Sequence, residues 1–360
     1  MSIRVIISGG GTGGHIFPAI AMANEIKRRE PNAEILFVGA ADRMEMQKVP
    51  EAGYPIKGLW ISGIQRKFSI ANLSLPFKWI HSLLESRKII KQFKPHVVVG
   101  VGGYASAAVL YVAAKMNMKT LIQEQNSFAG ITNRFLASKV NAICVAYPNM
   151  ERFFPKDKIK VTGNPVRAQL LDCKLTQEEA KLKLGFKPEQ KLVFITGGSL
   201  GARSLNKAVE NSLNLWQSLP LQLLWQTGSV YYNTYKGFKS QSIQVLDFVS
   251  HMDWAYKAAD LIVCRAGALT LAEITALGKA AILVPSPYVA EDHQTHNAQQ
   301  LVHANAALMI PDHLLNDQLA KQVAELIQNP TAIRSLQQNA SALAKPNATQ
   351  HIVDHILELI

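Results

Sequence analysis

Residues 259–301 read ADLIVCRAGALTLAEITALGKAAILVPSPYVAEDHQTHNAQQL, and this stretch decides the expected fold. The apolar run at 261–264 predicts a buried strand, and 269–277 predicts a helix that Gly278 ends. A second apolar run at 280–284 predicts the next strand. Strand, glycine turn, helix and strand make a right-handed parallel unit, the repeating element of α/β folds.

The turn at 265–268 is predicted to bind a phosphate, because it presents backbone N–H groups and the positive end of a helix dipole at one place. Glu273 lies one turn into the helix, where its carboxylate can accept from both hydroxyls of a ribose. The following loop supplies Asp292, His293, Gln294 and Asn297. An ordinary strand–helix–strand unit would also explain the turn. Polar residues at the carboxyl ends of two adjacent strands nevertheless favour a ligand site.

Length and composition indicate a globular protein of two domains. The chain has 360 residues, of which 48% are hydrophobic and 18% charged. No apolar run reaches the roughly 20 residues of a membrane-spanning helix. Met1 leads directly into an apolar run, so we expect no signal peptide. Cys144, Cys173 and Cys264 lack metal-binding spacing and are interpreted as reduced thiols of a cytosolic protein.

The formal net charge is +12, which suits nucleic acid, an anionic membrane surface or a polyanionic substrate. The basic residues are not in blocks, and no nucleic-acid-binding motif occurs. We therefore expect no nucleic-acid partner.

The beginning of the chain predicts a second ligand-binding turn. An apolar strand at 3–8 is followed by GGGTGGH at 9–15, and a helix is expected at 17–29. The turn lacks the Gly-Lys-Ser/Thr ending of a P-loop. Gly39-Ala40-Ala41 stands where a dinucleotide fold has an acidic residue, so NAD is disfavoured. His15 is either a packed capping residue or a group that accepts a proton or binds phosphate.

Two further strands of the first half, expected at 96–101 and 119–123, also end in unusual loops. The first loop reads GGYAS (102–106) and the second reads EQNS (124–127). Glycines, a histidine, a carboxylate and amides are thus expected at one edge of a sheet, the usual site of an α/β enzyme.

The segment from Trp60 to Lys94 is both apolar and basic. It is either a core helix with a solvated basic face or an amphipathic element that rests on anionic lipid. Its apolar residues include Ile64, Phe68, Ile70, Leu73, Phe77, Trp79, Ile80, Leu83 and Leu84, and its basic residues include Arg66, Lys67, Lys78, Arg87, Lys88, Lys91 and Lys94.

The second half of the chain repeats the design of the first. TGNPVR at 162–167 resembles a domain boundary. A strand at 192–196 then runs into GGSLGAR (197–203) and a helix to about Trp216. We therefore predict two Rossmann-like domains, residues 1–163 and residues 164–345. A C-terminal helix within 346–360 is expected to pack back on the first domain.

Seven motifs together resemble one family. They are GGGTGGHIFPA (9–19), GVGGYAS (100–106), EQN (124–126), GNPVR (163–167), GGSLGAR (197–203), CRAGALTLAEI (264–274) and DHQTHNA (292–298). In this order and at these spacings they are similar to the MurG family of bacterial peptidoglycan synthesis. The resemblance implies the glycosyltransferase B fold, an α/β fold with two Rossmann-like domains facing across a cleft.

The resemblance implies transfer of N-acetylglucosamine from UDP to the C4 hydroxyl of undecaprenyl-diphosphate-N-acetylmuramoyl-pentapeptide (lipid I). The product is lipid II, formed with inversion. Glu273 would hold the ribose, the backbone at 268–270 would face the diphosphate and Gln294 would bind the sugar. The donor-binding residues carried over by motif are Gly11, Thr12, Gly13, Asn126, Arg167, Ser199, Val249, Ala268, Leu269, Thr270, Leu271, Ala272, Glu273 and Gln294. The middle of the 284–292 loop is not diagnostic of the family.

Inversion needs one base on the acceptor hydroxyl. His15 is the first choice and Glu124 the second, although either residue could orient the phosphates of the acceptor instead. No Asp-x-Asp occurs in the sequence, so we expect no metal and no cofactor, and the helix dipole must stabilise the leaving diphosphate.

The implied partners are UDP-N-acetylglucosamine, lipid I, an anionic membrane surface that meets residues 64–87, and cell-wall and division proteins. The implied location is peripheral, at the cytoplasmic face of the bacterial inner membrane. One rival is another UDP-sugar enzyme of the same fold, either a 2-epimerase or a transferase with a different lipid acceptor. The other rival is a membrane-bound scaffold that binds a nucleotide sugar without turnover.

Overall fold

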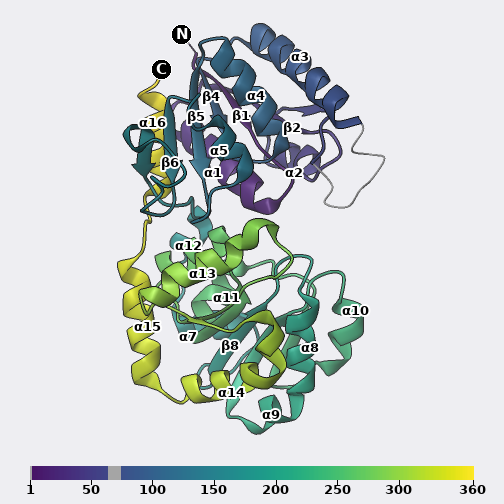
Figure 1. Ribbon diagram of the computed structural model, residues 1–360. Helices are drawn as coiled ribbons and strands as arrows, with labels where there is room; N and C mark the ends of the chain where they lie inside the picture. Colours follow the sequence, from purple (N-terminus) through teal and green to yellow (C-terminus); the bar gives the residue numbers. More distant parts are fainter. Residues whose placement is uncertain (1, 64–73) are drawn as a thin grey trace. The chain divides into compact units, whose positions relative to one another are not determined.

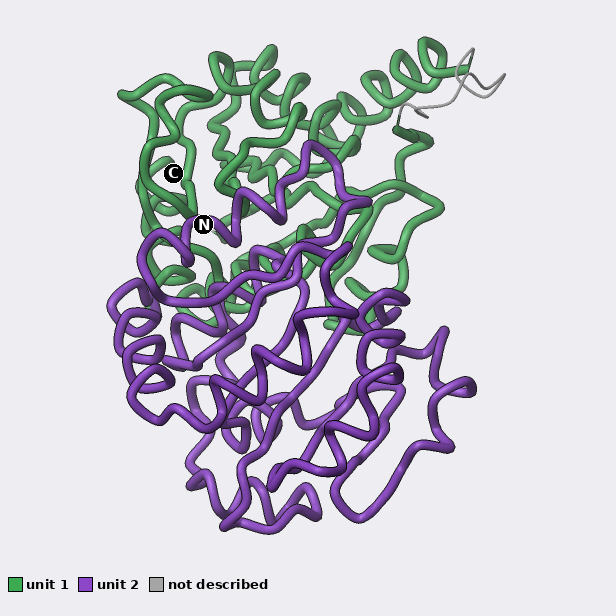
Figure 2. Tube along the Cα trace, turned by 60° about the horizontal axis from the view of Figure 1, so that its bottom comes forward, with its two compact units in different colours: residues 1–165, 347–360 green, residues 166–346 purple. Residues whose placement is uncertain are grey.

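The computed structural model describes residues 2–63 and 74–360. The chain divides into two compact units (Figure 2). Unit 1 comprises Met1–Pro165 with Asn347–Ile360, and unit 2 comprises Val166–Pro346.

Unit 1 is built on a seven-stranded parallel sheet of order β3-β2-β1-β4-β5-β6-β7. Its central strands are buried over nearly their whole length, because helices cover both faces. The strands are β1 (Arg4–Ser8), β2 (Glu34–Ala40), β3 (Ile56–Leu59), β4 (Val97–Gly100), β5 (Lys119–Glu124), β6 (Ala142–Val145) and β7 (Ile159–Val161).

Unit 2 has a six-stranded parallel sheet of order β10-β9-β8-β11-β12-β13. Its strands are β8 (Lys191–Thr196), β9 (Leu221–Gln226), β10 (Ile243–Leu246), β11 (Leu261–Arg265), β12 (Ala281–Val284) and β13 (Leu308–Met309). In both units the chain starts at a central strand, builds outward to one side and then crosses to the other. The switch lies between β1 and β4 in unit 1 and between β8 and β11 in unit 2, and such points are where α/β sheets bind ligands.

The helices of unit 1 include one from the end of the chain. Ile352, Val353 and Ile356 of α16 are buried in the core cluster that also contains Ile16 and Met22 of α1. Figure 1 shows α16, in yellow, among the elements of the N-terminal unit. The helices are α1 (Gly13–Arg29), α2 (Glu45–Glu51), α3 (Leu75–Phe93), α4 (Tyr104–Lys115), α5 (Ile131–Leu136), η2 (Lys156–Lys158) and α16 (Ala348–Leu357).

Helices cover the sheet of unit 2, and α12 connects its central β11 to β12. The helices are α6 (Ala168–Leu171), α7 (Gln177–Lys183), α8 (Arg203–Asn211), α9 (Leu213–Ser218), α10 (Tyr232–Tyr235), η3 (Lys236–Phe238), α11 (Met252–Ala258), α12 (Ala268–Ala276), η4 (Ala290–Asp292), α13 (His293–His303), η5 (Asp312–Leu314), α14 (Leu315–Ile327) and α15 (Pro330–Ala342).

Two expected helices are wrong in detail. α1 begins at Gly13, four residues before the expected start, so His15 lies inside its first turn. The helix expected to run to Trp216 ends at Asn211, and a new helix begins at Leu213. The indole of Trp216 donates to the Val209 carbonyl oxygen at 3.2 Å, which satisfies a carbonyl near the end of α8.

None of the helices in the described part of the chain is both long enough and apolar enough to cross a bilayer.

Candidate active site

The expected site residues fall into two groups, one in each unit. Unit 1 holds Gly11 and Thr12 of the β1–α1 loop, Gly13 and His15 in the first turn of α1, Glu124 at the end of β5, and Asn126 just after it. Unit 2 holds Arg167, Ser199, Val249, Ala268 to Glu273 and Gln294. In both units these residues lie at or beyond the carboxyl ends of parallel strands, with the exception of Arg167, which precedes α6.

The two loops at the switch point of unit 1 approach each other through backbone. A Cβ atom at Gly103 would lie only 2.6 Å from the Gly10 carbonyl oxygen. Gly103 also has a φ of +87°, which an L side chain rarely adopts. Glycine is therefore required at this position for the β1–α1 loop and the β4–α4 loop to meet.

His15 is half-buried and lies against these two loops. Its Nδ1 is 2.9 Å from the Gly10 carbonyl oxygen and 3.5 Å from Thr12 Oγ1. A carbonyl oxygen can only accept, so this contact assigns the proton to Nδ1 and the basic lone pair to Nε2. Nε2 is 3.0 Å from the place where a Cβ atom of Gly102 would be, so glycine gives the ring its room.

Glu124 is buried and accepts hydrogen bonds from its own loop. Oε1 accepts from the N–H of Asn126 at 3.0 Å and from its side-chain amide at 3.3 Å. Oε2 accepts from the N–H of Gly130 at 3.0 Å and from Asn133 Nδ2 at 2.8 Å. Four donors use the lone pairs of this carboxylate. The arrangement suits a residue that shapes the 124–130 loop better than one that takes a proton.

In unit 2, Glu273 joins two other segments. Its Oε1 accepts from Arg167 Nε at 2.7 Å, and its Oε2 accepts from the Tyr256 hydroxyl at 3.0 Å. Burial alone would lower the pKa of Arg167, but the hydrogen bond and charge of Glu273 outweigh burial and raise it. Burial, together with the charge of Glu273, raises the pKa of Tyr256 well above its usual value. Arg167 therefore stays charged and Tyr256 stays a donor.

The N-terminus of α12 follows directly from β11. Gly267 is the N-cap in extended conformation, and the first turn of the helix directs N–H groups out of the carboxyl edge of the sheet. No acidic residue lies in that turn. The turn thus provides the positive end of a helix dipole for an anion.

Arg265, the last residue of β11, fixes the surrounding loops. Its guanidinium donates to the carbonyl oxygens of Val284 at 3.3 Å and Pro285 at 3.2 Å, and to Ser204 Oγ at 2.8 Å. It also pairs with Asp312 at 2.5 Å. One half-buried cation therefore holds the ends of β11 and β12 and the start of α8 together.

Gln226, at the end of β9, connects two other parts of the predicted donor site. Its amide Nε2 donates to the Gly198 carbonyl oxygen at 3.0 Å, and its Oε1 accepts from the N–H of Val249 at 3.0 Å. Gly198 precedes Ser199, so one side chain sets the spacing between the Ser199 loop and the Val249 segment.

Gln294 lies in the first turn of α13 with its amide oriented by the preceding loop. Its Oε1 accepts from the N–H of Ser286 at 2.8 Å. The amide NH₂ group is therefore left to donate to an acceptor of a ligand. Glu291 and Asp292, just before α13, both adopt positive φ values, of 52° and 49°. Consecutive non-glycine residues in this region are strained, and such strain gathers at functional loops.

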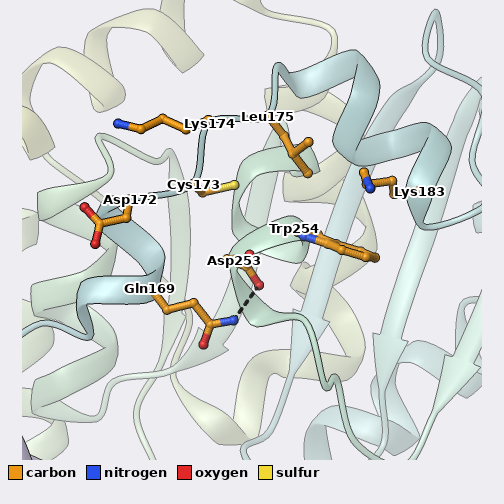
Figure 3. Close-up of a pocket in the computed structure, with 8 residues that line it drawn as sticks. All are labelled: Gln169, Asp172, Cys173, Lys174, Leu175, Lys183, Asp253 and Trp254. Atoms are coloured by element: carbon orange, nitrogen blue, oxygen red, sulfur yellow. Dashed lines mark hydrogen bonds between the residues drawn. The ribbon is translucent and has the colours of Figure 1, made fainter.

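A surface pocket of ≈ 340 Å³ opens beside α6 and α11, and none of the expected site residues lines it. Figure 3 shows Gln169 and Asp253 pointing toward each other across it, joined by a hydrogen bond of 3.2 Å. This bond ties α6 to α11. It therefore supports the helices that flank Arg167 and Tyr256.

The basic apolar segment is only partly described, since Ile64, Arg66, Lys67, Phe68, Ile70 and Leu73 lie outside the described residues. On α3, Phe77 is 72% exposed, Ile80 56% and Leu84 65%. Their spacing places them on one face. Trp79, expected to be on this surface, is instead half-buried against Tyr111 with a ring-centroid distance of 6.5 Å.

Sequence reasoning missed Tyr256, Gln226 and Arg265. Each is buried or half-buried and looks like an ordinary strand or helix residue, and only its hydrogen bonds show its role. Within residues 2–63 and 74–360, no group of three or more His, Cys, Asp and Glu side chains could hold a metal ion.

Comparison with known proteins agrees with this architecture. The N-terminal domain of glycosyltransferase family 28 matches residues 5–145, and the C-terminal domain of that family matches residues 192–355. A crystal structure of Acinetobacter baumannii MurG superposes with a TM-score of 0.82 at 31% identity and covers 99% of both chains. A UDP-GlcNAc 2-epimerase from Neisseria meningitidis, at 13% identity and a TM-score of 0.69, shares the fold alone. The predicted α/β class with two Rossmann-like domains, the glycosyltransferase B fold, is confirmed.

Two curated relatives cover nearly the whole chain. Both are named UDP-N-acetylglucosamine--N-acetylmuramyl-(pentapeptide) pyrophosphoryl-undecaprenol N-acetylglucosamine transferase. The relative from Cytophaga hutchinsonii is 53% identical over 99% of this chain and 97% of its own length. The relative from Christiangramia forsetii is 49% identical over 99% and 98%. With relatives of this identity and coverage, the chain belongs to the MurG family of glycosyltransferases.

Proposed function

We propose that this enzyme transfers N-acetylglucosamine from its UDP donor to the C4 hydroxyl of lipid I, giving lipid II with inversion at the anomeric carbon. The observation that carries the proposal is the edge of unit 2. There the N-terminus of α12, the carboxylate of Glu273 and the side-chain amide of Gln294 all follow strands of one sheet. The names of relatives about half identical over the full length support the same reaction.

The donor is bound by unit 2 in this proposal. The diphosphate lies at the first turn of α12, residues 268–270, where N–H groups and the helix dipole stabilise its charge. The ribose hydroxyls donate to Glu273, and the sugar accepts from Gln294. Each oxygen of Glu273 has one described hydrogen bond and can accept another, so the ribose need not displace Arg167 or Tyr256.

Negative charge grows on the diphosphate as UDP leaves. Preorganised donors that face this charge lower the barrier, because they need no reorganisation during the reaction. We assign this role to the α12 amides, with Arg167 and Ser199 as helpers. The proposed set of substrate-binding residues also includes Gly11, Thr12, Gly13 and Asn126 of unit 1 and Val249, Leu271 and Ala272 of unit 2.

His15 is the proposed base that takes the proton of the C4 hydroxyl. The Nδ1 contact with Gly10 supports this choice, since it leaves the lone pair on Nε2. Glu124 is then a positioning residue, because its oxygens accept from four N–H donors, three in the loop after β5 and one on α5.

Product analysis tests the reaction. Incubation with UDP-N-acetylglucosamine and lipid I should release UDP and form lipid II, while incubation with the donor alone should leave it unchanged. Conversion of the donor to its 2-epimer without acceptor would show an epimerase instead. Donor binding without turnover in the presence of lipid I would show a scaffold.

Exposed apolar residues on α3 form the proposed membrane contact. Phe77, Ile80 and Leu84 would enter the interface of the cytoplasmic leaflet, and Arg87, Lys88 and Lys91, also exposed, would meet anionic headgroups. The lipid tail of the acceptor stays in the bilayer, so the enzyme must work at this surface. Cell-wall and division proteins are the protein partners expected there.

A further inference from the structure

Glu45, at the start of α2, accepts two hydrogen bonds, one of them from the β1–α1 loop of unit 1. Its Oε2 accepts from the N–H of Gly11 and its Oε1 accepts from the N–H of Ala40, each at 3.0 Å. The residue is only 1% exposed. Cβ atoms at Gly10 and Gly39 would lie 1.9 Å from Oε1 and 2.5 Å from Cγ of Glu45, so both glycines make room for this carboxylate.

The peptide bond that Glu45 holds is also the one that contacts His15. The N–H of the Gly10–Gly11 peptide donates to Glu45, and the carbonyl oxygen of the same peptide accepts from His15 Nδ1 at 2.9 Å. Carboxylate, peptide and imidazole thus form one line of hydrogen bonds. Among residues 2–63 and 74–360, Glu45 forms no ion pair that would neutralise its charge.

We propose that Glu45 is a positioning residue for His15 and acts on it through the Gly10–Gly11 peptide. The inference rests on the proposed role of His15 as the base. Hydrogen bonds in a chain polarise one another, so a carboxylate on the N–H makes the carbonyl a stronger acceptor. The stronger acceptor holds the Nδ1–H tautomer and favours the imidazolium, as the carboxylate of a catalytic triad does by direct contact.

Glu45 would assist the proton transfer that accompanies attack of the C4 hydroxyl on the anomeric carbon. The O–H bond of the C4 hydroxyl breaks and its proton moves to Nε2 of His15. The freed oxygen pair forms the bond to the anomeric carbon, and the bond from that carbon to the diphosphate oxygen breaks, so that UDP leaves with its electrons. The negative charge of Glu45 stabilises His15 most strongly once the imidazole has taken the proton and become positive.

Other charged or titratable groups on the same side of unit 1 follow three strands, β2, β5 and β4. Asp42 and Arg43, in the β2–α2 loop, lie 3.7 Å apart and are exposed. Glu124, the last residue of β5, accepts from N–H groups of the loop that follows. Tyr104 begins α4, next to the Gly102-Gly103 turn. None of these has a described hydrogen bond to the Gly10–Gly11 peptide. Among them and Glu45, only Glu45 is described as hydrogen-bonded to this peptide.

The test compares Glu45→Gln, His15→Ala and the double variant, with Glu25→Gln as matched control. Glu25 is a buried carboxylate on α1, at the far end of the helix from His15. We expect Glu45→Gln to lower kcat about tenfold, with the donor KM unchanged within twofold. We expect the acid limb of the kcat/KM profile to move to lower pH, because the neutral amide no longer favours the imidazolium. Glu45→Gln should cost nothing more when His15 is already alanine, and Glu25→Gln should leave the profile in place.

Two results would overturn the proposal. One is an unmoved acid limb in Glu45→Gln; the other is an equal loss of kcat from Glu45→Gln in the His15→Ala background, which would reveal a role in loop shape alone. If Glu45→Gln does not fold, nitrogen NMR of the wild-type enzyme can test the proposal through the tautomer of His15. A neutral ring with its proton on Nε2 in place of Nδ1 would contradict the proposed hydrogen bonds. Full kcat in His15→Ala would instead show that the proposed base is wrong.

Discussion

Glu273, the proposed ribose ligand, also has partners within the protein. Its carboxylate also accepts hydrogen bonds from Arg167 and from the buried hydroxyl of Tyr256. Replacing Glu273 would remove the proposed ribose contact and would also leave two protein donors without their acceptor, and buried donors without acceptors are costly.

We expect Glu273→Ala to weaken donor binding by about 2–4 kcal/mol, the scale of a lost pair of charge-assisted hydrogen bonds. Tyr256→Phe should weaken binding much less, because the carboxylate stays in place. Calorimetric titration with UDP-N-acetylglucosamine measures both. An unchanged dissociation constant in Glu273→Ala would rule out the ribose contact.

Glu25 gives a prediction for stability against pH. The hydrogen bond from Arg28, with that from Arg29, holds the pKa of Glu25 at about 2, below its ordinary value of 4.5. A lowered pKa in the folded state stabilises the protein above the unfolded pKa, and this contribution disappears as the pH falls from 4.5 to 2. Arg28 is 67% exposed, so water screens part of the effect.

Glu25→Gln should therefore lower the free energy of unfolding by about 1–2 kcal/mol at pH 7. The difference from wild type should shrink below pH 4.5. Denaturant unfolding at a series of pH values checks this expectation. A difference that stays constant down to pH 2 would show that packing, not charge, is lost.

At the scale of the element, α3 separates two kinds of apolar residue. Trp79 packs on Tyr111, whereas Phe77, Ile80 and Leu84 face water. A membrane test must therefore change the second kind and leave Trp79 alone, because loss of a packed aromatic would confuse docking with stability.

We expect Phe77→Ser combined with Ile80→Ser to reduce binding to anionic vesicles at least severalfold, with an unchanged melting temperature. Leu182→Ser is the matched control, since Leu182 is 60% exposed but belongs to unit 2. Vesicle sedimentation at several salt concentrations measures the effect. Binding of the wild type should weaken as salt rises, because the basic residues are screened. Equal losses in the control would argue against α3 as the contact.

The sequence predicts elements better than it predicts their contacts. The 259–301 unit is right because apolar runs, a glycine turn and a helix stop are all local signals. The first turn of α1 was missed because Gly13 and Gly14 are poor helix formers, and the surrounding structure overrides that preference. Glu45 could not be connected to Gly11, since the two are 34 residues apart and only the fold brings them together.

At the scale of the whole molecule, the proposed mechanism stabilises the leaving diphosphate without a metal ion. No Asp-x-Asp occurs in the chain, whose net charge is +12. We expect transfer activity to persist in excess EDTA, because helix N–H groups take the place of a cation at the diphosphate. Initial rates with and without EDTA check this. Abolished activity that magnesium restores would contradict the helix-dipole account.

The return of α16 to unit 1 has a consequence for how the chain matures. Ile352, Val353 and Ile356 complete the core around Ile16 and Met22, yet all of unit 2 is synthesised between these two segments. Domains generally fold as their residues leave the ribosome, the first domain first. Part of the apolar surface of the first unit therefore stays uncovered until residues 348–357 have been synthesised, whereas the second unit has all its residues earlier. A nascent chain that stalls before residue 348 would expose that surface, and chaperones or proteases would meet it there.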